Sequence, residues 1–209
     1  MGNTKRSSAN QVLTSGRQIL RKIRSQPAAI EAFISTAQAL STTVSDAESA
    51  YCWLSCVLAL RALSQGNFGV GALLVDASGS IVATGGNQMF VPRFRSEAHA
   101  EMVVMNEFER RRKAVAHLAR YTLFTSLESC PMCLVRLVTA GVGTVVHVTA
   151  DTLGGMVTQK ETLPAAWKQL AANHAYREAT CAQELKELAT EIFALTRTKL
   201  NNKLRDRGA

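Results

Sequence analysis

The feature that most constrains the fold is a strand–helix–strand pattern in the second half of the sequence. Residues 121–126 and 144–149 are short runs that read as strands, and the second run is apolar and β-branched. Between them a helix is predicted from Cys130 to about Ala140, because Pro131 suits a first helical position. A strand, a helix and a strand in succession predict a right-handed crossover that joins two parallel strands.

A hairpin precedes this unit in the chain. Val70–Val75 is typical of a buried strand, Asp76-Ala77-Ser78-Gly79 is a turn signal, and Ile81–Thr84 is the returning strand. A further helix is predicted from about Glu97 to Lys113, and the residues beyond Gly155 are expected to be helical. Together these elements predict an α/β protein, a three-layer α/β/α sandwich with a mixed sheet and helices on both faces.

A long apolar helix is predicted before the hairpin. Ser45-Asp46-Ala47-Glu48 has the Ser-x-x-Glu spacing of a capping box, so the helix begins there and continues to about Ser64. Apolar side chains lie almost all round this helix, which predicts burial on more than one side, between the sheet and another layer. Cys52 and Cys56 lie within it and are therefore interpreted as core residues.

The net charge of +8 is concentrated at the two ends of the chain. The first 30 residues carry six basic and no acidic side chains, the last 14 carry five basic and one acidic, and the remainder sums to −2. We therefore divide the chain into a basic helical N-terminal extension (1–45), a core (46–160) and a helical C-terminal extension that packs on the core (161–209). Nucleic acid could bind the basic ends, but the core itself does not favour it, because phosphate binding needs positive charge at the site.

The sequence excludes an integral membrane protein, because it lacks the roughly 18 consecutive apolar residues that a span requires. A cytoplasmic protein is expected, and the acid-poor N-terminus leaves organelle targeting as the alternative. Five cysteines, an odd number that includes one Cys-x-x-Cys pair, fit a reducing compartment and metal chemistry better than a disulfide framework.

Two short segments carry the candidate chemistry, namely His99-Ala100-Glu101 and Cys130-Pro131-Met132-Cys133, each at the start of a predicted helix. Imidazole and thiolate are the ligands that Zn²⁺ prefers, and a helix N-terminus favours a deprotonated thiol. The sequence therefore predicts one zinc ion per chain, held by His99, Cys130 and Cys133. Three protein ligands leave the fourth position for water. The other cysteine and histidines have no partners at ligand spacing and are interpreted as structural or surface residues: Cys181, His117, His147 and His174.

Glu101 turns this predicted metal site into a candidate catalytic site. Two residues after His99, its carboxylate can take a proton from water and pass it to a leaving amine. His-x-Glu followed by Pro-Cys-x-x-Cys is the signature of zinc deaminases that act on cytosine or adenine.

The sequence resembles a known superfamily over roughly Asp46 to Gly155. The similar segments are Gly69-Val70-Gly71-Ala72-Leu73-Leu74-Val75, Asn87, Ala98-His99-Ala100-Glu101 and Thr125-Ser126-Leu127-Glu128-Ser129-Cys130-Pro131-Met132-Cys133. They resemble the cytidine and deoxycytidylate deaminase superfamily, and most of all its branch of tRNA adenosine deaminases, guanine deaminases and fungal-type cytosine deaminases. The resemblance implies a cytidine-deaminase-like fold with residues 46–160 as the zinc deaminase core, and a homodimer or higher oligomer.

The resemblance also implies residue roles. His99, Cys130 and Cys133 would bind zinc, and Glu101 would shuttle protons. Asn87 would contact the substrate, and the backbone N–H of Ala100 and the carbonyl of Leu127 would line the pocket. Asp151 would lie in the loop that shapes substrate choice. One position departs from the family pattern, since Ser129 stands where Pro is usual. A serine there could cap the following helix.

Three functions remain open on the sequence alone. The leading interpretation is a zinc-dependent hydrolytic deaminase that releases ammonia from a nucleobase, nucleoside or close analogue of cytosine, guanine or adenine type. The first alternative is a deaminase of tRNA adenosine or of another polynucleotide, which would flip the base into the same pocket. The second alternative is a non-catalytic scaffold with a structural zinc, and the presence of Glu101 counts against it.

Overall fold

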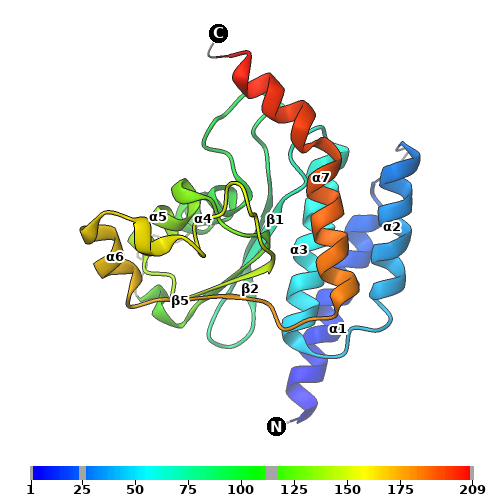
Figure 1. The fold of residues 1–209 in the computed structure, drawn as a ribbon. Helices are drawn as coiled ribbons and strands as arrows, with labels where there is room; N and C mark the ends of the chain where they lie inside the picture. Colours follow the sequence, from blue (N-terminus) through cyan, green and yellow to red (C-terminus); the bar gives the residue numbers. More distant parts are fainter. Residues whose placement is uncertain (1, 24–26, 112–116, 208–209) are drawn as a thin grey trace.

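The computed structural model describes residues 2–23, 27–111 and 117–207 (Figure 1). Its centre is a five-stranded sheet in the order β2-β1-β3-β4-β5. The strands are β1 (Gly71–Val75), β2 (Ile81–Gly86), β3 (Thr122–Leu127), β4 (Thr144–Thr149) and β5 (Ala175–Glu178). β1 runs antiparallel to both β2 and β3, whereas β3, β4 and β5 are parallel. The predicted mixed sheet and the parallel crossover pair are confirmed.

Helices cover both faces of the sheet, as the three-layer prediction requires (Figure 1). One face carries α4 (Ala100–Arg111), α5 (Pro131–Ala140) and α6 (Ala165–Ala171). The opposite face carries α3 (Ala47–Ser64) and α7 (Gln183–Arg205), and α1 (Gly2–Leu20) and α2 (Ala28–Leu40) pack on α3. Two short 3-10 turns, η1 (Leu118–Arg120) and η2 (Lys160–Thr162), connect elements.

Helix α3 is buried on more than one side, as its apolar pattern predicted. It contacts β1 and β3 on one side and α1, α2 and α7 on the others. The Trp53 indole is fully buried and donates a hydrogen bond from Nε1 to the carbonyl of Ala37 on α2 at 2.7 Å. Helix α1 approaches Trp53 so closely at Gly16 that a Cβ there would lie 2.2 Å from the indole ring. Cys52 and Cys56 belong to this core.

The predicted capping box at the start of α3 is wrong. The N-cap residue is Asp46, not Ser45, and the Asp46 side chain accepts a hydrogen bond from the Ser49 N–H at 2.9 Å. Glu48 does not reach back to the cap. Its carboxylate instead accepts hydrogen bonds from the Arg177 guanidinium and the Thr180 N–H, which lie in and after β5. A tertiary ion pair has therefore replaced the local bond that the spacing suggested.

The expectation that residues 161–209 are helical is wrong at β5. This strand is short and mostly exposed, so it lacks the apolar alternation that marks a strand in a sequence. It forms because β4 offers a free edge, with which Ala175–Glu178 pairs in parallel. The start of α4 also differs from the prediction, because this helix begins at Ala100 rather than at about Glu97. The predicted end of the same helix at Lys113 lies outside the described residues.

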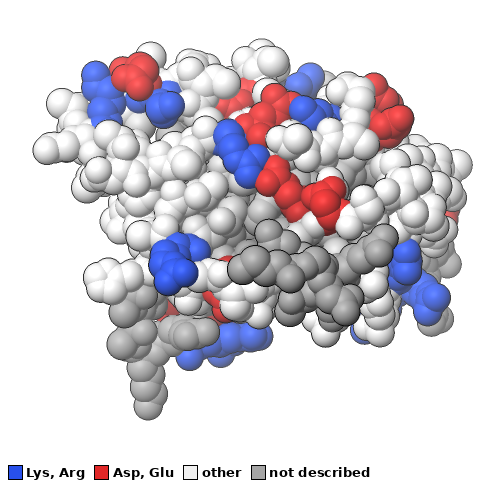
Figure 2. Space-filling model, turned by 90° about the horizontal axis from the view of Figure 1, so that it is seen from below, with Lys and Arg blue, Asp and Glu red and all other residues white. Residues whose placement is uncertain are grey.

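Within these described ranges, no helix combines the length and apolar character that crossing a membrane requires. On the face seen from below, basic and acidic side chains lie next to one another among uncharged residues (Figure 2). The described part of that face therefore carries mixed charge. The C-terminal end of α7 lies at the opposite side of the molecule (Figure 1).

Candidate metal and catalytic site

The ends of two helices bring the predicted metal ligands together. His99 directly precedes α4, Cys130 is the N-cap residue of α5, and Cys133 lies in the first turn of α5. The ligand atoms of these three side chains all lie within 4.8 Å of one another, and Cys130 Sγ is 3.5 Å from His99 Nδ1. Cys133 is buried, whereas His99 and Cys130 are half-buried. The cluster therefore reaches into the core at Cys133 and is partly accessible to solvent at His99 and Cys130.

The chemistry of this donor set fits zinc. A hydrogen bond from Cys133 is the main cause that lowers the pKa of the Cys130 thiol to about 4, and with the contribution of His99 it outweighs burial. The same hydrogen bond, together with burial, raises the pKa of Cys133. Burial lowers the pKa of His99, but the hydrogen bond to Cys130 and its charge raise it more. Zinc requires deprotonated thiols, so Cys130 is already suited to bind it and Cys133 would release a proton.

Glu101 lies in the first turn of α4, and its side chain is buried, with only 4% exposed. Burial is the main cause that raises its pKa, and the neighbouring Cys130 charge adds to the effect. The hydroxyl of Ser129 donates a hydrogen bond to Glu101 Oε1 at 2.9 Å. A buried carboxyl beside a metal cluster is placed to exchange protons with a molecule bound there.

A cavity of about 280 Å³ opens beside this cluster. That volume lies near the lower end of the range for small-molecule sites. Its wall includes His99, Glu101 and Cys130 together with the four residues that the resemblance places around the substrate: Asn87, Ala100, Leu127 and Asp151. The structure therefore brings every predicted site residue except Cys133, which is fully buried, to one cavity wall.

Three of these wall residues offer polar groups to the cavity, and in two of them a hydrogen bond fixes the group. Asn87 Oδ1 accepts a hydrogen bond from the Met89 N–H at 3.0 Å, which orients the side-chain amide. Ala100 is the first residue of α4, where backbone N–H groups have no partner within the helix. The Leu127 carbonyl accepts a hydrogen bond from the Thr125 hydroxyl at 3.0 Å and retains a second lone pair.

Asp151 reaches the cavity wall, but its carboxylate is engaged in its own loop. Asp151 Oδ1 accepts hydrogen bonds from the N–H groups of Leu153 and Gly154 at 3.2 and 3.1 Å. Asp151 therefore holds the shape of its loop, and its expected influence on substrate choice stays a prediction.

Glu128 has a structural role that the sequence analysis missed. Its buried carboxylate accepts hydrogen bonds from the backbone N–H groups of Asp151 and Thr158 at 3.0 and 2.9 Å, and from the Thr158 hydroxyl at 3.1 Å. Gly155 packs so closely on Glu128 that a Cβ would lie 2.4 Å from the carboxylate carbon. Glu128 thus fixes the loop over residues 151–158 that forms one side of the cavity. The sequence signal that could have indicated this role is the position of an acidic residue directly after an apolar strand.

Helix α7 supplies a cavity wall that was also missed. Phe193, Arg197, Asn201 and Leu204 line the cavity, and their spacing of four, four and three residues places them on one face of the helix. Further along, Lys203 lies 5.7 Å from the Phe90 ring centroid, and Arg207 lies 3.6 Å from that of Phe94. The basic C-terminal end of α7 therefore lies beside the candidate site. Its positive charge is close to the core, where the sequence analysis had placed only a net negative charge.

Ser129 does not cap α5, contrary to what the sequence suggested. The N-cap residue is Cys130, and the Ser129 hydroxyl turns instead toward Glu101. Two of the other cysteine and histidine residues have identified contacts. Cys181 is half-buried, and a hydrogen bond from Cys52 is the main cause that lowers its pKa. His174 Nδ1 lies 2.6 Å from the carbonyl oxygen of Val142. Cys181 therefore has a thiol neighbour that the sequence spacing did not predict, but among the described residues the metal cluster includes neither Cys181 nor His174.

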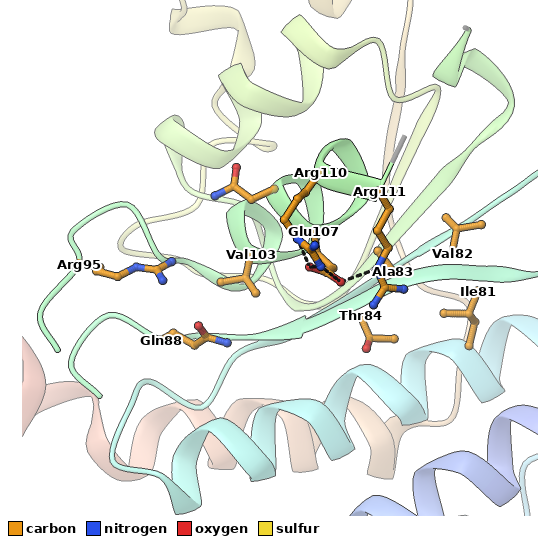
Figure 3. A pocket seen from close by; sticks show the side chains of 11 residues that line it. Ile81, Val82, Ala83, Thr84, Gln88, Arg95, Val103, Glu107, Arg110 and Arg111 are labelled. Carbon is orange, nitrogen blue, oxygen red and sulfur yellow. Dashed lines mark hydrogen bonds and ion pairs between the residues drawn. The ribbon is translucent and has the colours of Figure 1, made fainter. Parts of the chain in front are cut away.

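A second, larger cavity of about 550 Å³ lies between β2 and α4 (Figure 3). Figure 3 shows Glu107 between Arg110 and Arg111, and it pairs with both. Arg95 also lines this cavity and pairs with Glu97. The metal cluster does not line it, so the smaller cavity is the candidate catalytic site.

A mixed α/β/α sandwich with a His–Cys–Cys cluster and a buried glutamate at the starts of two helices defines the class of zinc-binding deaminase folds. The chain belongs to the cytidine and deoxycytidylate deaminase family, because residues 45–149, about half of its length, match the model of that family's zinc-binding region. The predicted superfamily is confirmed. Its zinc-binding region contains His99, Cys130 and Cys133, the cluster that can hold the ion.

Individual relatives agree with this membership. The tRNA-specific adenosine deaminase of Bacillus subtilis (strain 168) is 38% identical over 99 residues, which cover 46% of this chain and 58% of that protein. A structure from a study of A-to-I editing by tRNA:A34 deaminases has a TM-score of 0.54 at 22% identity, covering 68% of this chain and 97% of that one. A guanine deaminase from Nitrosomonas europaea has a TM-score of 0.52 at 19% identity, covering 69% and 81%. The two structures show that the fold is shared.

Proposed function

We propose that the protein is a zinc-dependent hydrolytic deaminase that replaces the exocyclic amino group of a nucleobase, nucleoside or close analogue with a carbonyl oxygen and releases ammonia. The observation that carries the proposal is the position of Glu101. It is a buried carboxyl with a raised pKa, and it lines the same cavity as the His99 and Cys130 side chains. A structural zinc site would not need a proton carrier on its wall.

His99, Cys130 and Cys133 would hold the metal, and Glu101 would move the protons. When bound, zinc supplies a nucleophile by lowering the pKa of water. Glu101 would accept one proton from the attacking water and donate it to the ring nitrogen beside the reacting carbon, and it would then pass the second proton, from the newly added hydroxyl group, to the departing amine. One water is consumed, a carbon–oxygen bond forms, and the carbon–nitrogen bond breaks as ammonia leaves.

The wall residues would orient the base. The Asn87 amide, fixed through its Oδ1, can donate to a ring acceptor, and the free N–H at the start of α4 can do the same from Ala100. The remaining lone pair of the Leu127 carbonyl can accept from the exocyclic amine. Phe68 and Phe193 offer aromatic surface on the same cavity wall, against which a planar base can pack.

The direct test is ammonia release from a panel of cytosine, adenine and guanine bases with their nucleosides and nucleotides, assayed with the zinc-loaded protein. Turnover of one member of the panel supports the proposal. Stoichiometric zinc with no turnover on any free or polynucleotide substrate would favour the scaffold alternative instead.

A polynucleotide substrate is the second candidate, and the position of α7 favours it. Lys203 lies over the ring of Phe90, and Arg207 lies over the ring of Phe94. Both rings belong to the loop that follows Asn87, and Asn87 lines the cavity, so these two positive charges lie near a base bound there. The match to a tRNA-specific adenosine deaminase supports the same reading. A flipped base would then enter the cavity while its phosphates contact the basic residues.

Salt dependence separates the two candidates. For a free base or nucleoside, we expect kcat/KM to change little between about 50 and 200 mM salt, a range over which the Debye length is roughly halved, because few counterions are released. An RNA substrate should lose affinity with a log–log slope of about −0.7 per phosphate contact. Neutralising Lys203 and Arg207 together should then reduce that slope, whereas neutralising Arg21 and Lys22, after α1, is the matched control. A steep slope that the α7 variant flattens would overturn the small-molecule proposal.

A further inference from the structure

We propose that Ser129 is a positioning residue, whose hydroxyl holds one carboxylate oxygen of Glu101 and leaves the other for proton transfer. The inference rests on the proposed function, in which Glu101 carries protons. It concerns a position where this chain differs from the family pattern, because proline, which is usual there, has no hydroxyl to offer.

The contact is short and shielded from water. Ser129 Oγ lies 2.9 Å from Glu101 Oε1, the Ser129 side chain is fully buried, and only 4% of Glu101 is exposed. Because few water molecules can compete at such a site, a hydrogen bond to a carboxylate there is stronger than one at the surface.

Ser129 is itself held in place by the loop on the other side of the cavity. Its carbonyl accepts a hydrogen bond from the Met156 N–H at 2.9 Å, and the adjacent Glu128 binds the backbone of Asp151 and Thr158. The turn between β3 and α5 is thus tied to the loop over residues 151–158. Since the backbone of Ser129 is fixed, its hydroxyl can fix the longer and more flexible side chain of Glu101.

The hydrogen bond is compatible with both states of a proton carrier. A carboxylate oxygen accepts from a hydroxyl, and the carbonyl oxygen of a carboxyl protonated on its other oxygen also accepts. Ser129 can therefore keep Oε1 in place while a proton arrives at and leaves Oε2. Holding the reacting group in its productive geometry contributes to the rate rather than to substrate binding.

Ser129→Ala tests the proposal. We expect kcat to fall about tenfold, as for loss of one hydrogen bond to a charged group. KM and the zinc content should stay unchanged. The matched control is Ser126→Ala, which removes another buried hydroxyl from β3, one that accepts a hydrogen bond from the Gly71 N–H at 3.1 Å. This control should lower stability and leave kcat unchanged.

A double-mutant cycle with Glu101→Ala shows whether the effect passes through Glu101. Adding Ser129→Ala to Glu101→Ala should cause no further loss of turnover, and the shifts in urea midpoint should be non-additive, because the two residues interact. For the single variant Ser129→Ala, an unchanged kcat or a raised KM would overturn the proposal. In the double-mutant cycle, an equal loss of turnover in the Glu101→Ala background or additive shifts in the urea midpoint would do the same. If the wild-type protein releases no ammonia from any substrate, the proposed function fails and the positioning role fails with it, even where the urea cycle shows that the hydrogen bond forms.

Discussion

Cys133→Ala is expected to lose the bound zinc and to unfold at a lower temperature than the wild-type protein. Cys133 is the buried member of the cluster, and its removal leaves two ligands at a site whose atoms now lie within 4.8 Å of one another. A ligand present at a hundred times its Kd stabilises the fold by about 2.7 kcal/mol. For a chain of this size, each kcal/mol shifts the Tm by roughly 2–4 °C. Metal analysis should find one zinc per chain in the wild type and close to none in the variant.

Cys56→Ala provides the matched control for this experiment. Cys56 is also fully buried, but it lies in α3 within the core on the other face of the sheet. Its removal should lower stability and leave the zinc content unchanged, and a chelator should lower the Tm of this control but not that of Cys133→Ala. Retention of stoichiometric zinc by Cys133→Ala, or a wild-type protein without zinc, would contradict the ligand assignment.

Glu101→Gln is expected to keep its zinc and to lose turnover by a factor of about 10² or more. Glutamine has the shape of glutamate, and its amide oxygen can still accept the Ser129 hydrogen bond, but it cannot carry a proton at neutral pH. Steady-state ammonia release and metal content, measured on the same preparation, check both parts of this expectation.

The Glu101→Gln result also separates catalysis from structure. A loss of zinc along with turnover would mean that Glu101 supports the metal cluster rather than the reaction. Near-normal turnover on the true substrate would remove Glu101 from the proton route. Both outcomes would leave the family membership intact and would change only the mechanism.

The parts of the molecule that follow from local spacing were predictable from sequence. His99 and Glu101 are two residues apart at a helix start, and Cys130 and Cys133 are three apart at another, so each helix end fixes its own pair. The central strands and the apolar helix α3 were equally clear, because their side chains repeat with the period of the element. The sequence therefore predicted the layers, the sheet type and the metal cluster.

What could not be predicted depends on contacts between distant segments. The strand β5 exists because it pairs with β4, and the Glu48–Arg177 ion pair that accompanies it joins residues 129 positions apart. Ser129 meets Glu101 across 28 residues, and no local rule favours that contact over a helix cap. The cavity face of α7 carries both polar and apolar side chains, so its pattern did not distinguish a substrate wall from a surface stripe.

The separation between α7 and the helices that carry the metal ligands has a consequence for how this protein can diversify. In the proposed reaction the chemistry depends on α4 and α5, whereas Arg197 and Asn201 reach the same cavity from a helix that begins more than 30 residues after the family match ends. Substitutions in α7 can therefore alter which molecule is accepted while the metal ligands remain in place. If the proposed reaction holds, a gene duplicate could acquire new substrates through this one helix and keep the metal ligands unchanged.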